Sequence, residues 1–237
     1  MIGTEVFLAG LPGADERRSY KHEARAIQPV RKIVVKGAVD LFFRRFGTPH
    51  LVVAGETEEA LRRVKTTIKG DKLVVESEGY GVQISSAHGS ISIGSVSGGS
   101  IYVNGQRIDI GGVGGGRVVV GVALPELPAL KIKGSGDVSL MDLRQAGLEI
   151  EIEGSGDVTA DGQVEQLEVS IAGSGDVDAR ELIAQRGHLS IAGSGDISAH
   201  VSQEVVARIA GSGDIVVRGN PASRSKQVLG SGSVKFK

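Results

Sequence analysis

The sequence contains no cysteine and no tryptophan, and only 3% of its 237 residues are aromatic. Without cysteine there is no disulfide, no thiolate metal ligand and no cysteine nucleophile, and the redox compartment is left open. No run of about 18 apolar residues occurs, so we expect no transmembrane helix. The formal net charge of −1 supplies no general positive field, so we expect no binding to nucleic acid.

The N-terminal residues lack the features of a signal peptide. Met1 to Ala14 has no basic start, and Glu5 interrupts its short apolar stretch. Residues 1–26 are rich in charge and broken by glycine and proline, so we predict an N-terminal arm over 1–26. Residues 27–237 are predicted to form one domain.

Glycine is abundant, with 36 residues, and much of it belongs to a repeat. The tetrapeptide Gly-Ser-Gly-Asp recurs every 18–20 residues, starting at Gly134, Gly154, Gly173, Gly193 and Gly211, with a variant at Gly230 in which Ser233 replaces the aspartate. This period is too short for helical-pair repeats or propeller blades, which need at least about 33 residues. It is typical of one coil of a β-solenoid.

Apolar residues hold fixed positions around each repeat. Two residues before it stand Ile132, Ile152, Ile171, Ile191, Ile209 and Val228; directly after it stand Val138, Val158, Val177, Ile197, Ile215 and Val234; two further on stand Leu140, Ala160, Ala179, Ala199, Val217 and Phe236. Alternation with a period of two indicates strands with one buried face. We therefore predict an all-β fold, a right-handed parallel β-helix (β-solenoid) with 18–20 residues per coil.

Charged residues support the same alignment. In the stacked coils Lys131 would lie beside Glu151, and Lys133 beside Glu153.

Residues 27–125 are predicted to form irregular coils, and residues 126–237 the regular coils. Within the first part, apolar alternation predicts strands over residues 27–78, and the glycine-rich residues 79–121 are predicted to form irregular coils and hairpins. Thr57 is a candidate N-cap for a short helix over 58–64, because acidic residues come first and basic residues last. Asn104-Gly105 indicates a tight turn.

With these motifs in view, the sequence resembles the head GIN domain family of autotransporter adhesins, bacterial domains of unknown function. The resemblance covers about residues 27–237 and rests on Ile33-Val34-Val35-Lys36-Gly37, Leu73-Val74-Val75, Val122-Ala123-Leu124-Pro125-Glu126-Leu127 and the repeats. It implies a β-solenoid, a location in the cell envelope, periplasm or surface, and an adhesive role. Because no signal peptide is visible, a cytoplasmic location stays open.

The repeated carboxylates are the sharpest candidate site: Asp137, Asp157, Asp176, Asp196 and Asp214. Aspartates that follow glycine are candidate Ca²⁺ ligands. The favoured interpretation is structural, with each side chain accepting a hydrogen bond from a nearby backbone N–H in a glycine turn. We predict no cofactor.

Two further places are candidate partner contacts. Phe42, Phe43, Arg44, Arg45 and Phe46 combine aromatic rings with cations before Pro49; the alternative is a strand end with one or two buried rings. The last coil has no capping helix, so Val234 and Phe236 are expected to lie against another subunit or the arm, and self-association through the solenoid ends is predicted.

No nucleophile elbow, phosphate-binding loop or paired-histidine motif occurs. A catalytic site would be expected to break the repeat at one coil, and the ladder is uniform. We therefore predict a non-enzymatic surface or interaction module that binds a protein or polysaccharide. The alternatives are a carbohydrate-active solenoid enzyme and a scaffold that polymerises end to end.

Overall fold

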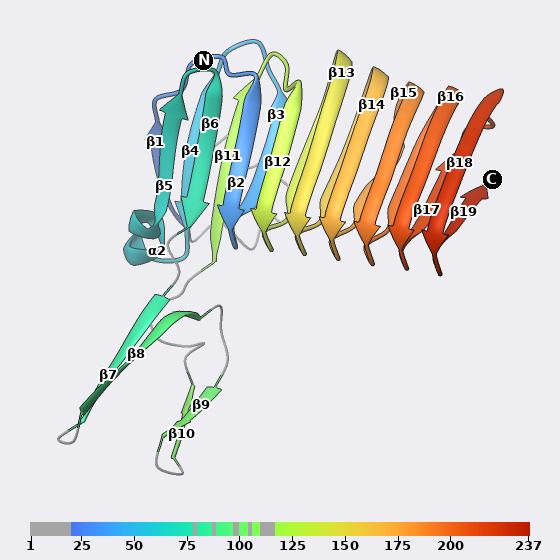
Figure 1. Cartoon of the computed structure of the whole chain (residues 1–237). Helices are drawn as coiled ribbons and strands as arrows, with labels where there is room; N and C mark the ends of the chain where they lie inside the picture. The colour runs from blue at the N-terminus through green and yellow to red at the C-terminus, as the bar shows by residue number, and fades with distance from the viewer. Residues whose placement is uncertain (1–19, 78–79, 87–88, 97–99, 104–105, 110–116) are drawn as a thin grey trace.

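The computed structural model describes residues 20–77, 80–86, 89–96, 100–103, 106–109 and 117–237. The described residues are nearly all in β-strands, with one short helix, and they form a β-solenoid of about 5 turns. Figure 1 shows the coils following one another along a single axis. The predicted fold class is confirmed.

The regular coils are built from parallel strands that occupy the C-terminal half. These are β12 (Ala129–Gly134), β13 (Val138–Gly154), β14 (Val158–Gly173), β15 (Val177–Gly193), β16 (Ile197–Gly211), β17 (Asp214–Arg218), β18 (Ser223–Gly230) and β19 (Ser233–Phe236). Strands β13 to β16 each run around most of a coil, and each pairs in parallel with the strand of the next coil. In the last coils β17 and β18 both pair with β16, and β19 pairs with β17.

The predicted aliphatic columns are present. Ile152 pairs with Ile132 on one side and with Ile171 on the other, and the column continues in register to Val228. Burial of branched aliphatic side chains in such columns is the main stabilising contribution of the fold, at about 1.5–3 kcal/mol for each fully buried side chain. One continuous core runs through the whole solenoid.

The N-terminal half extends this core by another topology. Its strands in the main sheet are β1 (Lys21–Arg25), β2 (Lys32–Gly37), β3 (Asp40–Arg45), β4 (His50–Gly55), β5 (Val64–Lys69), β6 (Lys72–Ser77) and β11 (Val118–Leu124). Strand β2 lies between β6 and β12, and β3 lies between β11 and β13. Strands occupy most of residues 27–78, as the sequence predicts, but they pair out of chain order and several pairs are antiparallel. Strand β1 also lies within the stretch that we expected to be an arm.

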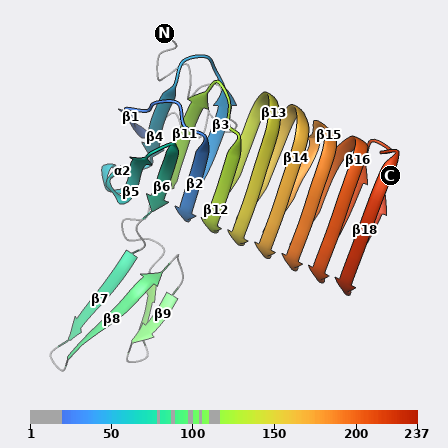
Figure 2. The same ribbon diagram turned by 45° about the horizontal axis from the view of Figure 1, so that its top comes forward.

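Two hairpins lie outside the main sheet (Figures 1 and 2). Strand β7 (Tyr80–Ser86) pairs with β8 (Gly89–Val96), and β9 (Ser100–Val103) pairs with β10 (Gln106–Asp109). The predicted turn at Asn104–Gly105 lies outside the described residues.

The short helix α2 (Glu58–Arg63) forms where the sequence predicts it, within one residue at its C-terminal end. The Ala60 N–H donates to Thr57 Oγ1 at 3.1 Å, so Thr57 is the N-cap. Ala60 and Leu61 are buried. Among the described residues, no helix is long and apolar enough to cross a membrane.

Candidate functional site

The aspartates of the repeat lie in one column on the edge where the coils turn. Each Oδ1 accepts a hydrogen bond from the backbone N–H of the equivalent residue in the next coil. The donor–acceptor distances are 3.3 Å for Asp157 N to Asp137, 2.8 Å for Asp176 N to Asp157, 2.8 Å for Asp196 N to Asp176, 2.7 Å for Asp214 N to Asp196 and 2.8 Å for Ser233 N to Asp214. The carboxylates therefore join neighbouring coils.

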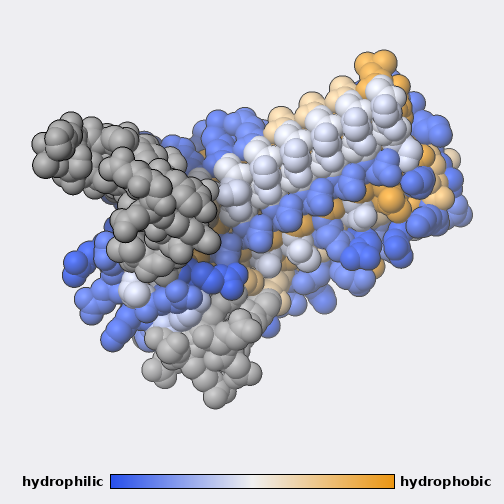
Figure 3. Space-filling model, turned by 90° about the horizontal axis from the view of Figure 1, so that it is seen from below, coloured by the Kyte–Doolittle hydropathy of each residue, from blue (hydrophilic) through white to orange (hydrophobic). Residues whose placement is uncertain are grey.

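The glycines of the turn permit the coils to approach closely. Gly193 has a φ of +148°, and a Cβ atom there would lie 2.0 Å from the carbonyl oxygen of Gly173. Gly195 has equally little space for a side chain, because a Cβ atom added there would lie 2.0 Å from the Gly175 carbonyl oxygen. Only glycine fits such positions. Figure 3 looks onto this edge and shows rows of one hydropathy running along the solenoid.

No metal centre is evident in this column. Within the described part of the chain, no three His, Asp or Glu side chains gather so that they could hold a metal ion. At the end of the column, the pKa of Asp214 is lowered by the Ser233 hydroxyl, by the Ser233 N–H and by Lys235, in that order. Each Oδ1 is already engaged by a backbone N–H, while the Ca²⁺ alternative stays a prediction.

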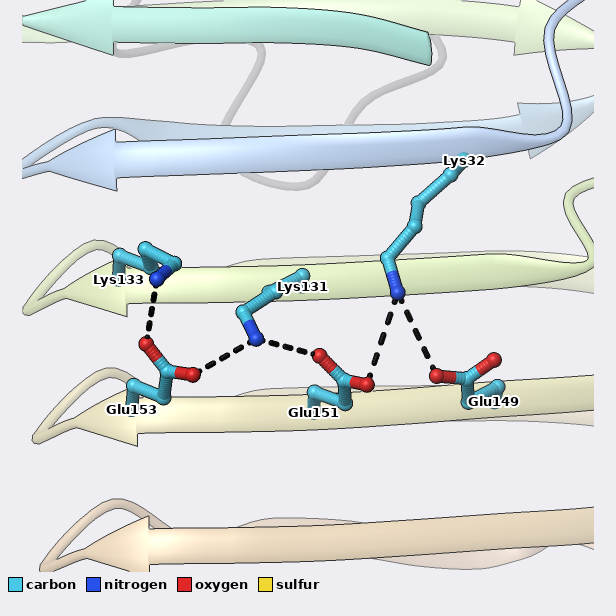
Figure 4. Close-up of polar contacts among 6 residues, drawn as sticks. All are labelled: Lys32, Lys131, Lys133, Glu149, Glu151 and Glu153. Atoms are coloured by element: carbon cyan, nitrogen blue, oxygen red, sulfur yellow. Dashed lines mark hydrogen bonds and ion pairs between the residues drawn. The ribbon is translucent and has the colours of Figure 1, made fainter. Parts of the chain in front are cut away.

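A network of lysines and glutamates covers one face, across β2, β12 and β13 (Figure 4). Lys131 Nζ lies 2.7 Å from Oε2 of Glu151 and 2.7 Å from Oε1 of Glu153. Lys133 Nζ lies 2.7 Å from the other oxygen of Glu153. The predicted neighbours, Lys131 beside Glu151 and Lys133 beside Glu153, are confirmed by the strand register.

The network extends to β2 through Lys32. Its Nζ lies 3.4 Å from Glu149 Oε1 and 3.6 Å from Glu151 Oε1. The pKa of Glu151 is lowered to about 2, first by its hydrogen bond from Lys131, then by Glu149, and also by the charge of Lys32. The same contacts, that with Glu151 first and that with Glu153 second, raise the pKa of Lys131. These contacts favour the charged forms of Lys131 and Glu151.

A groove of about 340 Å³ opens beside this network. Arg31, Glu126, Glu149 and Glu168 lie along it, together with Gln145 and Gln166. The volume is near the lower limit for a small-molecule site, and no aromatic ring lines it. Its polar groups suit a hydrogen-bonding ligand such as a sugar.

Gln145 is the groove residue that the sequence pattern could have revealed, although it was not among the predicted site residues. The register aligns it with Val164, which aligns with Ala184 and then with Val201, all three buried. Gln145 is therefore a polar residue at the start of an aliphatic column. Its Nε2 donates to the Leu127 carbonyl at 2.7 Å, and its Oε1 accepts from the Leu127 N–H at 2.9 Å. The side chain fastens the loop before β12 and forms one wall of the groove.

The residues 42–46 do not form one exposed patch. Phe43 is fully buried in the main core, and Phe42 is buried on the other face of β3. Arg44 and Arg45 are exposed, and Arg44 Nε donates to Asp142 Oδ2 at 3.0 Å. Phe46 is half-buried and stacks edge-to-face on His50. Of these five residues, only the two arginines and part of Phe46 are accessible to a partner.

The predicted contact residues of the last coil are also partly covered. Val234 is only 8% exposed, and Phe236 packs against the core. The Arg224 guanidinium lies 4.9 Å from the centre of the Phe236 ring. A residue of the same coil therefore shields Phe236.

Comparison with known families adds to this geometry. The family described as "Putative auto-transporter adhesin, head GIN domain" matches residues 30–221. The chain belongs to this family. The match spans the head GIN domain from the residues just before β2 to just beyond β17. No curated protein sequence matches the chain.

Solved structures share the fold of this head GIN domain. A putative adhesin from Bacteroides fragilis has a TM-score of 0.63 at 17% identity, over 93% of this chain and 98% of its own. A putative adhesin from Parabacteroides distasonis has a TM-score of 0.54 at 16% identity, over 92% of this chain and 97% of its own. At such low sequence identities, these similarities concern the fold alone.

Proposed function

We propose that this head GIN domain is a non-enzymatic module of the cell envelope or surface that binds a protein or polysaccharide partner. The observation that carries the proposal is the regular register of its coils. Side chains of one kind recur in straight rows along the solenoid (Figure 3). A rigid surface with a regular repeat can engage a repetitive ligand at several points, so weak contacts combine into useful avidity. The family and the names of its structural neighbours support a surface role.

The groove is the feature that could serve an enzymatic function in place of binding. Paired carboxylates can hydrolyse glycosides, and Glu126 and Glu168 both line the groove. Hydrolysis would require these carboxylates to act as acid and as base or nucleophile on a bound glycoside. Binding requires only polar contacts, so turnover separates the two functions.

The location is tested first. Intact source cells are treated with protease, and the protein and a cytosolic marker are followed by immunoblot. We expect the protein to be digested while the marker stays intact. A protein that is protected on intact cells and recovered wholly in the cytosolic fraction would overturn the surface role.

Binding and catalysis are then separated with the purified chain. Immobilised polysaccharides and surface proteins are probed with the protein as prepared and with the protein clustered on beads. Clustering should strengthen binding if the repeated face acts by avidity. Turnover of an acidic polysaccharide that is lost in Glu168→Gln, but kept in Glu165→Gln, would replace the proposal with the enzymatic alternative.

A further inference from the structure

The outer edge of β18 is an unpaired strand edge. On one side β18 pairs in parallel with β16 from Ser223 to Gly230. On the other side, no strand among the described residues pairs with it, and all eight of its residues are exposed. Figures 1 and 2 show β18 at the end of the row of coils. Such an edge presents free backbone N–H and C=O groups to another strand.

Two cationic residues of β18 occupy positions at which the preceding coils have core residues. Arg224 is in register with Val205, and Lys226 with Ala207. Both columns are aliphatic or glycine in the coils before: Leu148, Leu167, Gly187 and Val205 in one, and Ile150, Val169, Leu189 and Ala207 in the other. The last coil thus replaces core residues with two positive charges at alternate positions.

The two cations have different local contacts. Arg224 Nε donates to the Pro221 carbonyl at 2.7 Å, and its guanidinium covers Phe236. Lys226 has no hydrogen bond or ion pair within the part of the chain that the structure describes. Its charge is available to a partner.

The charge of the last coil differs from that of the coils before it. Residues 215–237 contain five Lys or Arg and no Asp or Glu, a net charge of +5. Residues 126–214 contain six Lys or Arg and sixteen Asp or Glu, a net charge of −10. A second copy of the same edge would bring these cations close to one another, which is unfavourable. Charge therefore favours an acidic partner over a second copy.

The protein already contains a pairing of this kind. Lys131 and Lys133 stand at alternate positions of β12, and Glu151 and Glu153 face them from β13 at 2.7 Å. Arg224 and Lys226 have the same spacing of two residues. A strand with carboxylates at alternate positions would meet them in the same way.

We propose that the outer edge of β18 binds an extended peptide segment that carries acidic side chains at alternate positions, and so adds one strand to the solenoid. Backbone hydrogen bonds to β18 supply affinity, as in other cases of strand addition. Arg224 and Lys226 select the acidic side chains, and Val228 takes an apolar residue two positions further on. This edge is separate from the groove, and the inference does not depend on what the groove binds.

The test uses a labelled peptide of sequence Thr-Glu-Thr-Glu-Thr-Val-Thr-Gly, which matches Ser223 to Gly230 in parallel register. A peptide with lysine in place of both glutamates is the control. Fluorescence anisotropy is measured with the full chain. We expect the acidic peptide to bind at least tenfold more tightly than the lysine peptide, and added salt to weaken it. Absence of binding at millimolar peptide would overturn the proposal.

Two variants with equal charge change test the register. Lys226→Gln and Gln227→Glu each lower the net charge by one, but Gln227 is aligned with the exposed Arg208 and points outward. We expect the first to weaken peptide binding about fivefold and the second to change it less than twofold. Equal weakening by both would overturn the proposal and indicate attraction to any anionic polymer. A concentration-dependent dimer that the acidic peptide fails to displace would overturn it in favour of a second copy.

Discussion

Asp176 Oδ1 accepts a hydrogen bond from the backbone N–H of Asp196, one coil further on, at 2.8 Å. The main chain joins the same coils in the other sense, because the Val177 N–H donates to the Asp196 carbonyl at 2.9 Å. The aspartate side chain thus completes the sheet across a turn in which glycines interrupt regular pairing. Its role requires an acceptor oxygen at this position and does not require a negative charge.

This geometry distinguishes a turn role from a Ca²⁺ role. We expect Asp176→Asn to keep the wild-type melting temperature, because an amide oxygen can accept the same N–H. Asp176→Ala should lose about 1 kcal/mol of unfolding free energy, because the Asp196 N–H loses its partner. Thermal and urea unfolding measure both. A Ca²⁺-dependent rise in the wild-type melting temperature that disappears in Asp176→Asn would support the metal site instead.

Glycine at the turn is required by the distance between coils. In Gly193→Ala the new methyl group would lie 2.0 Å from the Gly173 oxygen, on a backbone with a φ of +148°. We expect a loss of about 1–3 kcal/mol or more in unfolding free energy, from the clash and the strain together. Gly147→Ala is the control, because its Cβ would meet nothing closer than 4.0 Å. Equal melting temperatures for the two variants would contradict the close approach of the turns.

The regular coils could be predicted from the sequence because their contacts are periodic. Once the repeat aligned Ile132 with Ile152, the lysines and glutamates beside them were aligned as well, and the structure has this register. A strand of a solenoid pairs with the strand one repeat away, so the repeat length alone defines the partner. The short helix was also predictable, because Thr57 and the charges of its two ends are local signals.

The N-terminal half was less predictable because its contacts are not periodic. Strand β11 inserts between β3 and β4, although about 60 residues separate it from β4 and about 70 from β3, and no local pattern encodes such a partner. Phe42 and Phe43 illustrate the same limit. They alternate across β3, and both are buried because another cluster, with Val52 and Val119, covers the second face. The groove was missed because its only signal is one polar residue, Gln145, in a column that is otherwise aliphatic.

The register of the core can be tested with a buried charge. Ile171 is 1% exposed and lies between Ile152 and Ile191 in the column. We expect Ile171→Asp to cost about 3–5 kcal/mol, because the carboxylate is buried without a partner. Ser190→Asp, which places a carboxylate on the outward face next to Arg208, should change stability by less than about 0.5 kcal/mol. Circular dichroism during thermal unfolding compares them, and an unchanged melting temperature for Ile171→Asp would contradict the register.

The ion-pair network predicts how stability changes in acid. The pKa of Glu151 lies at about 2 in the folded protein, below its ordinary value of 4.5, chiefly because Lys131 donates a hydrogen bond to it. A lowered pKa means that its stabilising contribution is complete above about pH 4.5 and is lost as the pH falls toward 2. We expect Glu151→Gln to be less stable than wild type at neutral pH, and to lose less stability than wild type in that window. Urea midpoints measured between about pH 6 and pH 2 show how steeply the stability of wild type and of Glu151→Gln falls with pH.

Glu165→Gln is the control for this acid dependence. Glu165 is exposed and has no ion pair within the described residues, so its substitution removes one carboxylate without touching the network. We expect its urea midpoints to fall with pH as steeply as those of wild type, because this substitution leaves every ion pair of the network in place. If Glu165→Gln flattened the curve as much as Glu151→Gln, the acid sensitivity would be a general property of the surface carboxylates and not of the network. The pairing of Lys131 with Glu151 would then contribute nothing measurable to stability.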